Sequence, residues 1–188
     1  MSELFSIQLQ NRQQQGGDGV WLDLPTTTEQ VQAALRQIGI SSDNPQGLFI
    51  SGYFAEEEKR FAISYNMVLA SNVDELNFLA SRLETLSTGE RAELNAALQA
   101  PQSELFSIGR ITDFPENVDY YVHLPDVHGP AQLGDYYLNR SGMVNMPEEW
   151  KGGIDTAQFG RYVAQQEQGA FTQYGYLVKS GDEWQKVH

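Results

Sequence analysis

Carboxylates are the side chains of this sequence whose number and spacing suggest a function. Between residues 113 and 167 there are nine acids and only three bases. The acids are Asp113, Glu116, Asp119, Asp126, Asp135, Glu148, Glu149, Asp155 and Glu167, and the bases are Arg140, Lys151 and Arg161. Two such carboxylates can catalyse a reaction together, one as general acid and one as general base. Alternatively, many of them can present negative charge to a basic partner.

A glycosidase-like pair of carboxylates is one catalytic alternative. Glu148 or Glu149 would supply one member and Asp119 or Asp155 the other. However, adjacent glutamates in a Pro-Glu-Glu-Trp sequence are more typical of a helix N-terminus, where the first turn favours negative charge. This pair therefore gives little support to an enzyme.

The other catalytic motifs are weaker. His123 and His128 form the one cluster of metal-ligating residue types, but their spacing fits no metal motif and Pro125 indicates a loop. The glycine-rich segment 15–19 has no Walker lysine and precedes a strand, which excludes a phosphate-binding loop. There is no cysteine to serve as nucleophile or ligand. We expect no catalytic residue, no metal and no cofactor, and an enzyme remains only a third alternative.

Composition narrows the class of partner. The 188 residues are 40% hydrophobic, enough to bury a core, and the net charge is −13. Such a charge points away from nucleic acid as a direct ligand, because phosphates are repelled, and it suits a basic protein, although acidity can also serve solubility alone. No segment approaches the roughly 20 apolar residues of a membrane span, and the N-terminus has no positive leader. The sequence predicts a cytoplasmic protein without membrane contact.

The first sixty residues predict a small α+β unit. Apolar residues alternate or cluster in three segments that we interpret as strands, at 4–9, 20–24 and 48–53. Thr26 and Glu29 offer a capping box for a helix that ends near Gly39. We expect a three-stranded sheet with one helix.

A helical unit is predicted for residues 61–102. Asn72 caps one helix, and Ser87 with Glu90 forms a capping box for a second, which together indicate an αα-hairpin. The charged residues of these helices are candidates for a secondary acidic face: Asp74, Glu75, Glu84, Glu90 and Glu93.

An exact repeat marks the start of the third unit, residues 103–188. The hexapeptide Ser-Glu-Leu-Phe-Ser-Ile occurs at 2–7 and again at 103–108, and predicts a strand that recurs at the start of successive units. Four further elements are expected, a strand at 120–124, helices at 133–138 and 154–165, and a closing strand at 171–178. The aromatic run within the last strand could complete a core or a subunit contact. The polar tail after residue 178 is expected to fray.

Several motifs, taken in order, resemble one family. They are Gly-Val-Trp-Leu-Asp-Leu at 19–24, the helical segment 72–100, Glu-Asn-Val-Asp-Tyr-Tyr at 116–121, Leu-Gly-Asp-Tyr-Tyr at 133–137, the segment 154–161, and Gly-Ala-Phe-Thr-Gln-Tyr-Gly-Tyr at 169–176. Together they resemble the ArdA antirestriction proteins carried by mobile elements, over nearly the whole chain. The third unit is the most specific part, because several separate motifs occur there in the right order.

The resemblance implies an elongated protein of three small α+β and helical domains, here 1–60, 61–102 and 103–188, that forms a homodimer through its C-terminal domain. Proteins of this family imitate duplex DNA in the specificity and methyltransferase subunits of type I restriction-modification enzymes. The phosphate-mimicking residues expected here are Asp113, Glu116, Asp119, Asp126, Asp135, Glu148, Glu149 and Asp155. The alternative from another class is an acidic adaptor that binds a different basic DNA-binding protein.

Overall fold

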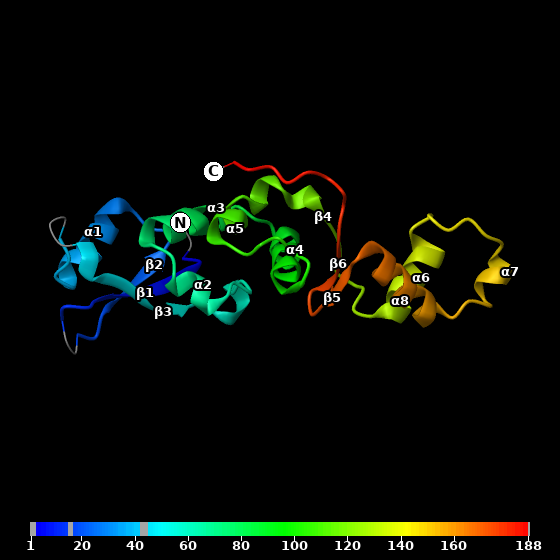
Figure 1. Ribbon diagram of the computed structural model, residues 1–188, viewed down its shortest axis with the longest axis horizontal. Helices are drawn as coiled ribbons and strands as arrows, with labels where there is room; N and C mark the ends of the chain where they lie inside the picture. Colours follow the sequence, from blue (N-terminus) through cyan, green and yellow to red (C-terminus); the bar gives the residue numbers. More distant parts are fainter. Residues whose placement is uncertain (1–2, 15–16, 42–44, 188) are drawn as a thin grey trace. The chain divides into compact units, whose positions relative to one another are not determined.

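The computed structural model describes residues 3–14, 17–41 and 45–187 (Figure 1). The chain forms two compact units. The first unit contains Met1–Leu86 and Leu105–Pro115, and the second contains Ser87–Glu104 and Glu116–Val187. Each unit has a three-stranded sheet and several helices, which confirms the α+β class. The division into three domains stays a prediction.

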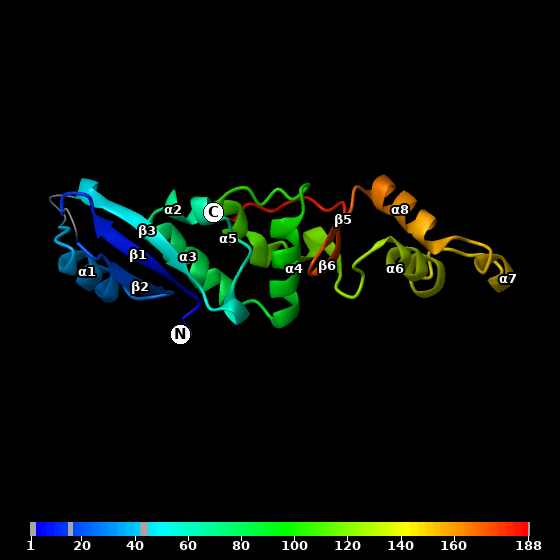
Figure 2. The ribbon, with the colours of Figure 1, turned by 90° about the horizontal axis from the view of Figure 1, so that it is seen from below.

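The sheet of the first unit forms from the three predicted strands (Figure 2). They are β1 (Phe5–Asn11), β2 (Val20–Leu24) and β3 (Leu48–Phe54), paired antiparallel in the order β2-β1-β3. Alternate residues of β1 are buried, as the period of a half-buried strand requires. A register shift between Gln8 and Leu9 interrupts the pairing with β3.

The helices of the first unit are short. They are α1 (Thr28–Gln37), α2 (Tyr65–Leu69), α3 (Val73–Leu83) and α5 (Ile108–Thr112), with the 3-10 turns η1 (Pro45–Gly47) and η2 (Glu57–Lys59). The turn η3 (Phe114–Glu116) follows α5. The predicted cap of Asn72 on α3 is confirmed, since its side chain accepts from the Glu75 N–H.

The predicted capping box of α1 was wrong by one residue. Thr27 caps the helix and Gln30 completes the box. The reason is a tertiary contact at Thr26, whose N–H donates to Asn77 Oδ1 at 2.7 Å and whose carbonyl accepts from Asn77 Nδ2 at 3.0 Å. With its backbone already bonded, Thr26 stays outside the helix.

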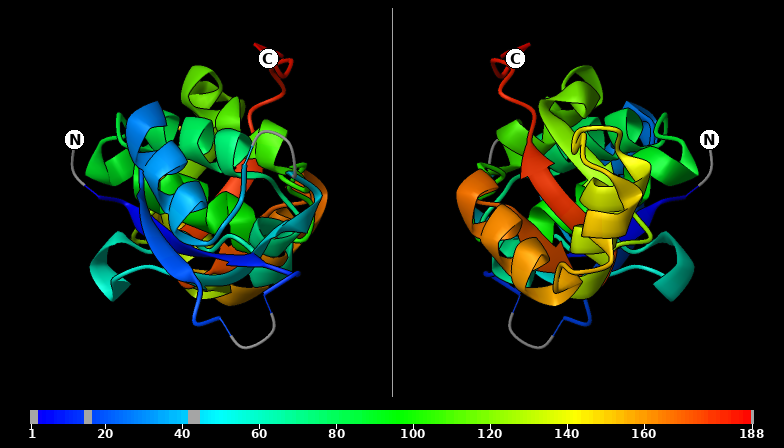
Figure 3. Two further views of the ribbon diagram at one scale, coloured as in Figure 1. Left: turned by 90° about the vertical axis from the view of Figure 1, so that its left-hand side faces the viewer. Right: turned by 90° about the vertical axis from the view of Figure 1, so that its right-hand side faces the viewer.

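The second unit begins with α4 (Thr88–Gln99), capped by the predicted Ser87–Glu90 box. The turn η4 (Val118–Tyr120) leads into β4 (Tyr121–Leu124), and α6 (Pro130–Asp135) continues as the π-helical turn η5 (Tyr136–Arg140). After α7 (Glu148–Lys151) comes α8 (Thr156–Glu167), shown in orange in the right-hand view of Figure 3. The two helices predicted as one hairpin, α3 and α4, belong to different units.

The C-terminal strand is a hairpin and not one continuous strand as predicted. β5 (Ala170–Thr172) and β6 (Gly175–Lys179) pair antiparallel, and β6 also pairs with β4. Gly175 makes the turn with a φ of 115°, where a Cβ would lie 2.4 Å from the Leu124 carbonyl oxygen. Thr172 closes it by accepting from the Tyr174 N–H and donating to the Gly175 carbonyl.

The second copy of the hexapeptide is not a strand, so that prediction was wrong. The last three residues of the first copy, Phe5 to Ile7, begin β1, whereas Glu3 and Leu4 precede the strand and Ser2 lies outside the described residues. In the second copy Ser107 caps α5, accepting from the Arg110 N–H. Residues 5–7 form a strand because β2 and β3 pair with β1 on either side, whereas residues 103–106 form no strand.

A glycine contact joins α6 to α8. A Cβ at Gly160 would lie 1.8 Å from the Pro130 carbonyl oxygen, and one at Gly134 would lie 2.0 Å from the Thr156 carbonyl oxygen. The two backbones therefore touch where only glycine fits. This contact accounts for Gly160 within an otherwise ordinary helix.

We predict that Gly160→Ala destabilises the protein by about 2–3 kcal/mol, because backbone on the opposite helix cannot move aside. Thermal unfolding should show a melting temperature lower by roughly 4–10 °C. The control is Gly89→Ala on α4, where an added Cβ would have no atom within 4 Å apart from its chain neighbours and the backbone of its own helix. That change should preserve or raise the melting temperature, since alanine is the better helix former. Equal melting temperatures of the two variants would contradict a close backbone contact between α6 and α8 at Gly160.

Candidate functional site

The phosphate-mimicking residues expected from the sequence divide by location. Asp113 belongs to the first unit, at the end of α5, and its side chain is only 2% exposed. The other seven belong to the second unit. Those exposed to solvent are Glu116, Asp119, Asp126, Glu148, Glu149 and Asp155, whereas Asp135 is half-buried. A buried carboxylate cannot reach a partner's arginine, so Asp113 is not part of the surface considered below.

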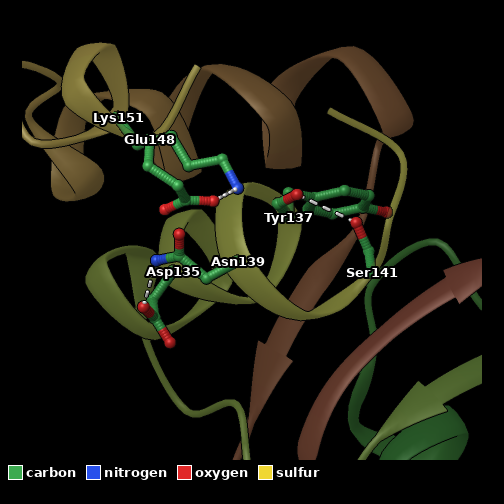
Figure 4. Close-up of polar contacts among 6 residues, drawn as sticks. All are labelled: Asp135, Tyr137, Asn139, Ser141, Glu148 and Lys151. Atoms are coloured by element: carbon green, nitrogen blue, oxygen red, sulfur yellow. Dashed lines mark hydrogen bonds and ion pairs between the residues drawn. The ribbon is translucent and has the colours of Figure 1, made fainter. Parts of the chain in front are cut away.

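Two of these carboxylates have basic or polar neighbours within the same unit (Figure 4). Asp135 accepts from Asn139 Nδ2 at 2.8 Å and lies 3.4 Å from Arg140 Nε. Glu148 pairs with Lys151 Nζ at 2.7 Å. Pairs at a surface contribute only about 0–1 kcal/mol. A basic partner can therefore exchange them for its own side chains at little cost.

Asp155 has a role in the fold as well as a surface position. Its Oδ1 accepts from the backbone N–H groups of Ala157 and Gln158, each at 2.9 Å, and so caps α8. The pairing of Glu148 with Lys151 and the capping by Asp155 give two of the four candidates for the glycosidase-like pair a structural explanation, whereas Glu149 and Asp119 are exposed.

The C-terminal tail contributes two acids that sequence reasoning missed. Asp182 and Glu183 line a shallow pocket together with Glu116 and Asp119. All four side chains are exposed. The pocket brings together carboxylates from two segments more than sixty residues apart in the sequence.

This tail is anchored and not frayed, which corrects the expectation. The Asn117 side chain donates to the Gln185 carbonyl at 2.9 Å and accepts from its N–H at 2.7 Å. The Trp184 ring packs edge-on against Tyr120, with centroids 5.1 Å apart. The signal available in the sequence was Trp184, an aromatic residue in an otherwise polar tail.

The predicted secondary acidic face is divided between the units. Asp74, Glu75 and Glu84 lie at α3 in the first unit, whereas Glu90 and Glu93 lie on α4 in the second. Glu90 completes the capping box, and the hydrogen bond from the Ser87 side chain, with that from its backbone, lowers the Glu90 pKa. Glu90 therefore keeps its negative charge within that cap.

Glu93 differs from the other acids of α4. Burial, and then the neighbouring charges of Asp119 and Glu90, raise the pKa of Glu93 to about 8. Its Oε1 is buried and has no hydrogen-bond partner among the described residues. At neutral pH this side chain is mostly protonated and does not contribute a full charge to the surface.

Glu167 is half-buried and bonds to tyrosines of the second unit's core. It accepts hydrogen bonds from the hydroxyls of Tyr137 and Tyr176, the latter at 3.0 Å. Burial is the main reason that the pKa of both tyrosines is raised. The negative charge of Glu167 and the hydrogen bonds to it raise the pKa of both further. Tyr176 is fully buried and Phe171 packs on the same core, so the aromatic run completes a core as one of the two alternatives expected.

The His123 side chain has a local explanation, because its Nε2 lies 2.7 Å from the Tyr174 carbonyl oxygen. At His128 the backbone N–H donates to Gln132 Oε1, and the residue is exposed. In the part of the chain that the structure describes, no group of three or more histidine, aspartate or glutamate side chains could hold a metal ion. Among the same residues, no helix has the length and apolarity to cross a membrane.

Comparison with known families agrees with the resemblance in the sequence. The family described as Antirestriction protein (ArdA) matches residues 16–178. This chain belongs to the ArdA family of antirestriction proteins. Among curated proteins, no relative matches the chain.

We predict that Glu93→Gln changes how stability depends on pH. In the folded chain the Glu93 pKa is about 8, above the ordinary value of 4.5, so the folded state holds a proton that the unfolded state releases. Wild-type stability therefore falls as pH rises from about 5 to 8. The variant should lack this loss, melting a few degrees higher than wild type at pH 8–9 and close to it at pH 5.

The matched control is Gln99→Ala, an exposed residue of the same helix with no ionisable group. Its melting temperature should follow the wild-type pH profile. A Glu93→Gln profile that ran parallel to wild type over pH 5–9 would show that Glu93 is not buried as described.

Proposed function

We propose that this antirestriction protein acts as a DNA mimic, occupying the DNA-binding channel of type I restriction-modification enzymes without catalysing a reaction. The observation that carries the proposal is the surplus of carboxylates in the second unit, with thirteen acids and six bases. The exposed ones are Glu116, Asp119, Asp126, Glu148, Glu149, Asp155, Asp182 and Glu183. As a competitor of DNA, the protein would act in the cytoplasm.

The chemistry of a DNA-binding channel supports this proposal. Duplex DNA carries one negative charge per roughly 1.7 Å of its axis, and the basic channel that binds it pairs with phosphates. An arginine guanidinium donates two parallel hydrogen bonds to a carboxylate in much the same geometry as to a phosphate. The targets we propose are the specificity and methyltransferase subunits, because they bind DNA before cleavage. Both cleavage and methylation would then be blocked.

The group formed by Glu116, Asp119, Asp182 and Glu183 is the part of the surface we expect to matter most. Each exposed ion pair contributes about 0.2–1 kcal/mol. Neutralising one carboxylate should therefore weaken inhibition by less than about fivefold. Neutralising all four, as Gln or Asn, should weaken inhibition on the order of 30-fold, and inhibition should decline as salt rises.

The measurement is competition between the protein and a labelled DNA duplex for a purified type I methyltransferase. A matched control exchanges Asp for Glu and Glu for Asp at the same four positions, which keeps every charge and should preserve inhibition. If wild-type protein bound a basic DNA-binding protein yet left DNA binding and methylation by the enzyme unchanged, the acidic adaptor would be the better account.

We further propose that the chain forms a homodimer through its C-terminal part. Met143, Trp150 and Tyr162 of the second unit are large apolar side chains exposed to solvent, which supports a contact there. Sedimentation velocity at micromolar concentration should show a dimer. Replacing Trp150 and Tyr162 by Ser should raise the dimer dissociation constant about tenfold, whereas Phe106→Ser in the first unit should not. A wild-type protein that sediments only as a monomer would rule the dimer out.

A further inference from the structure

The sheet of the first unit has one face in the core and one face open. Along β1, Ile7 and Leu9 are buried, whereas the alternating residues Ser6, Gln8 and Gln10 are only half-buried. Both α1 and α3 contact β2, and α2 contacts β3. The open face carries polar side chains along its central strand, as expected for a sheet covered on one side only.

Two large aromatic side chains interrupt this polar face. Trp21 on β2 pairs with Gln8, and Phe54 on β3 pairs with Ser6, so both lie on the open face, one on each side of β1. Trp21 is 50% exposed and Phe54 is 55% exposed. Two exposed aromatic rings on one face form a candidate interaction site.

The Trp21 ring is held in place by the sheet. A Cβ at Gly52 would lie 3.0 Å from Trp21 Cη2 and 3.1 Å from Gln8 Cβ, so the indole reaches across the central strand to a glycine on the far strand. A larger residue at position 52 would force the ring to move. Half of the indole nevertheless remains accessible, which makes it a rigid aromatic surface prepared for a ligand.

Carboxylates border both aromatic rings. Glu3 and Asp23 line the shallow pocket at Trp21, and Glu3 and Glu56 line the one at Phe54. Lys59 also lies at this end of the face, and it pairs with Glu56 at 3.0 Å. The surroundings of the two rings are therefore negative, which suits a cation and repels the phosphates of a nucleic acid.

The same face already contains a contact of the kind that these groups could form with a partner. The Arg12 guanidinium lies 5.2 Å from the centre of the Phe49 ring, beyond the other end of β1. Arginine stacks on aromatic faces and also forks to a carboxylate, whereas lysine offers only a point charge. Trp21 beside Asp23 and Glu3 offers both interactions to one arginine side chain.

We propose that the open face around Trp21 and Phe54 receives an arginine side chain from the DNA-binding surface of the restriction-modification enzyme, with the guanidinium stacked on Trp21 and paired with Asp23 or Glu3. This inference rests on the proposed function, because the same enzyme supplies the arginine. It adds a contact that charge alone does not provide. If the protein imitated phosphates with carboxylates alone, removing the Trp21 ring would leave its binding to the enzyme unchanged.

The test compares three full-length variants, Trp21→Ala, Trp21→Phe and Phe106→Ala, by competition with a labelled duplex for a purified type I methyltransferase. Phe106 is a matched control, because it is 74% exposed in the same unit but lies outside the sheet. Trp21→Ala should weaken inhibition on the order of tenfold, as expected for loss of a cation–π contact that is partly desolvated. Trp21→Phe should retain part of the inhibition, and Phe106→Ala should retain all of it.

Thermal unfolding of each variant separates a loss of binding from a loss of folding, and Trp21→Phe keeps a ring at the site if Trp21→Ala proves unstable. If wild type inhibits and both Trp21 variants inhibit equally well, the arginine contact is overturned while the proposed function stands. An equal loss in Phe106→Ala also overturns it, because the effect would then belong to exposed aromatic residues in general. A wild type that fails to compete with DNA would instead contradict the proposed function.

Discussion

An excess of negative charge is the constraint that the rest of this structure has to meet. The chain has 25 acidic and 12 basic side chains, so at least half of the carboxylates lack a base of their own. A carboxylate without a basic partner must face water, accept hydrogen bonds, or take up a proton. All three outcomes occur within the second unit, at Asp119, Glu167 and Glu93 respectively.

Some carboxylates serve the fold, and one of them, Asp155, is also exposed to a partner. Asp155 and Glu90 cap helices, and Glu167 joins two tyrosines of the core. Their removal would change stability as well as charge. The surface available for binding is consequently smaller than the composition suggests, but it gains Asp182 and Glu183 from the anchored tail. Because its charge is distributed, a mimic built in this way depends on no single acid.

Charge and aromatic surface offer a basic partner two different kinds of contact. Carboxylates attract any cation over a distance limited by salt screening, about 8–10 Å under ordinary conditions. An aromatic ring such as Trp21 acts only on contact and favours the planar guanidinium group. Combined in one protein, long-range attraction would bring the partner near, and short-range stacking would select arginine-rich surfaces over merely basic ones.

The sequence by itself determined the features that depend on near neighbours along the chain. The three strands of the first sheet, the caps at Asn72 and Ser87, the net charge and the family were all predictable, because alternation, capping and motifs involve residues only a few positions apart. Which of the acids face a partner was only partly predictable, since the pattern does not distinguish exposed Asp119 from buried Asp113.

Only the tertiary structure decided the features that depend on distant residues. Two identical copies of one hexapeptide differ in conformation, because only the first has a strand on each side to pair with. The first helix starts at Thr28 because Asn77 binds the backbone of Thr26. The tail is held by Asn117, 68 residues away from Gln185, and the pKa of Glu93 rises because folding buries it beside Asp119. Each outcome follows from a contact between segments that the order of residues does not place together.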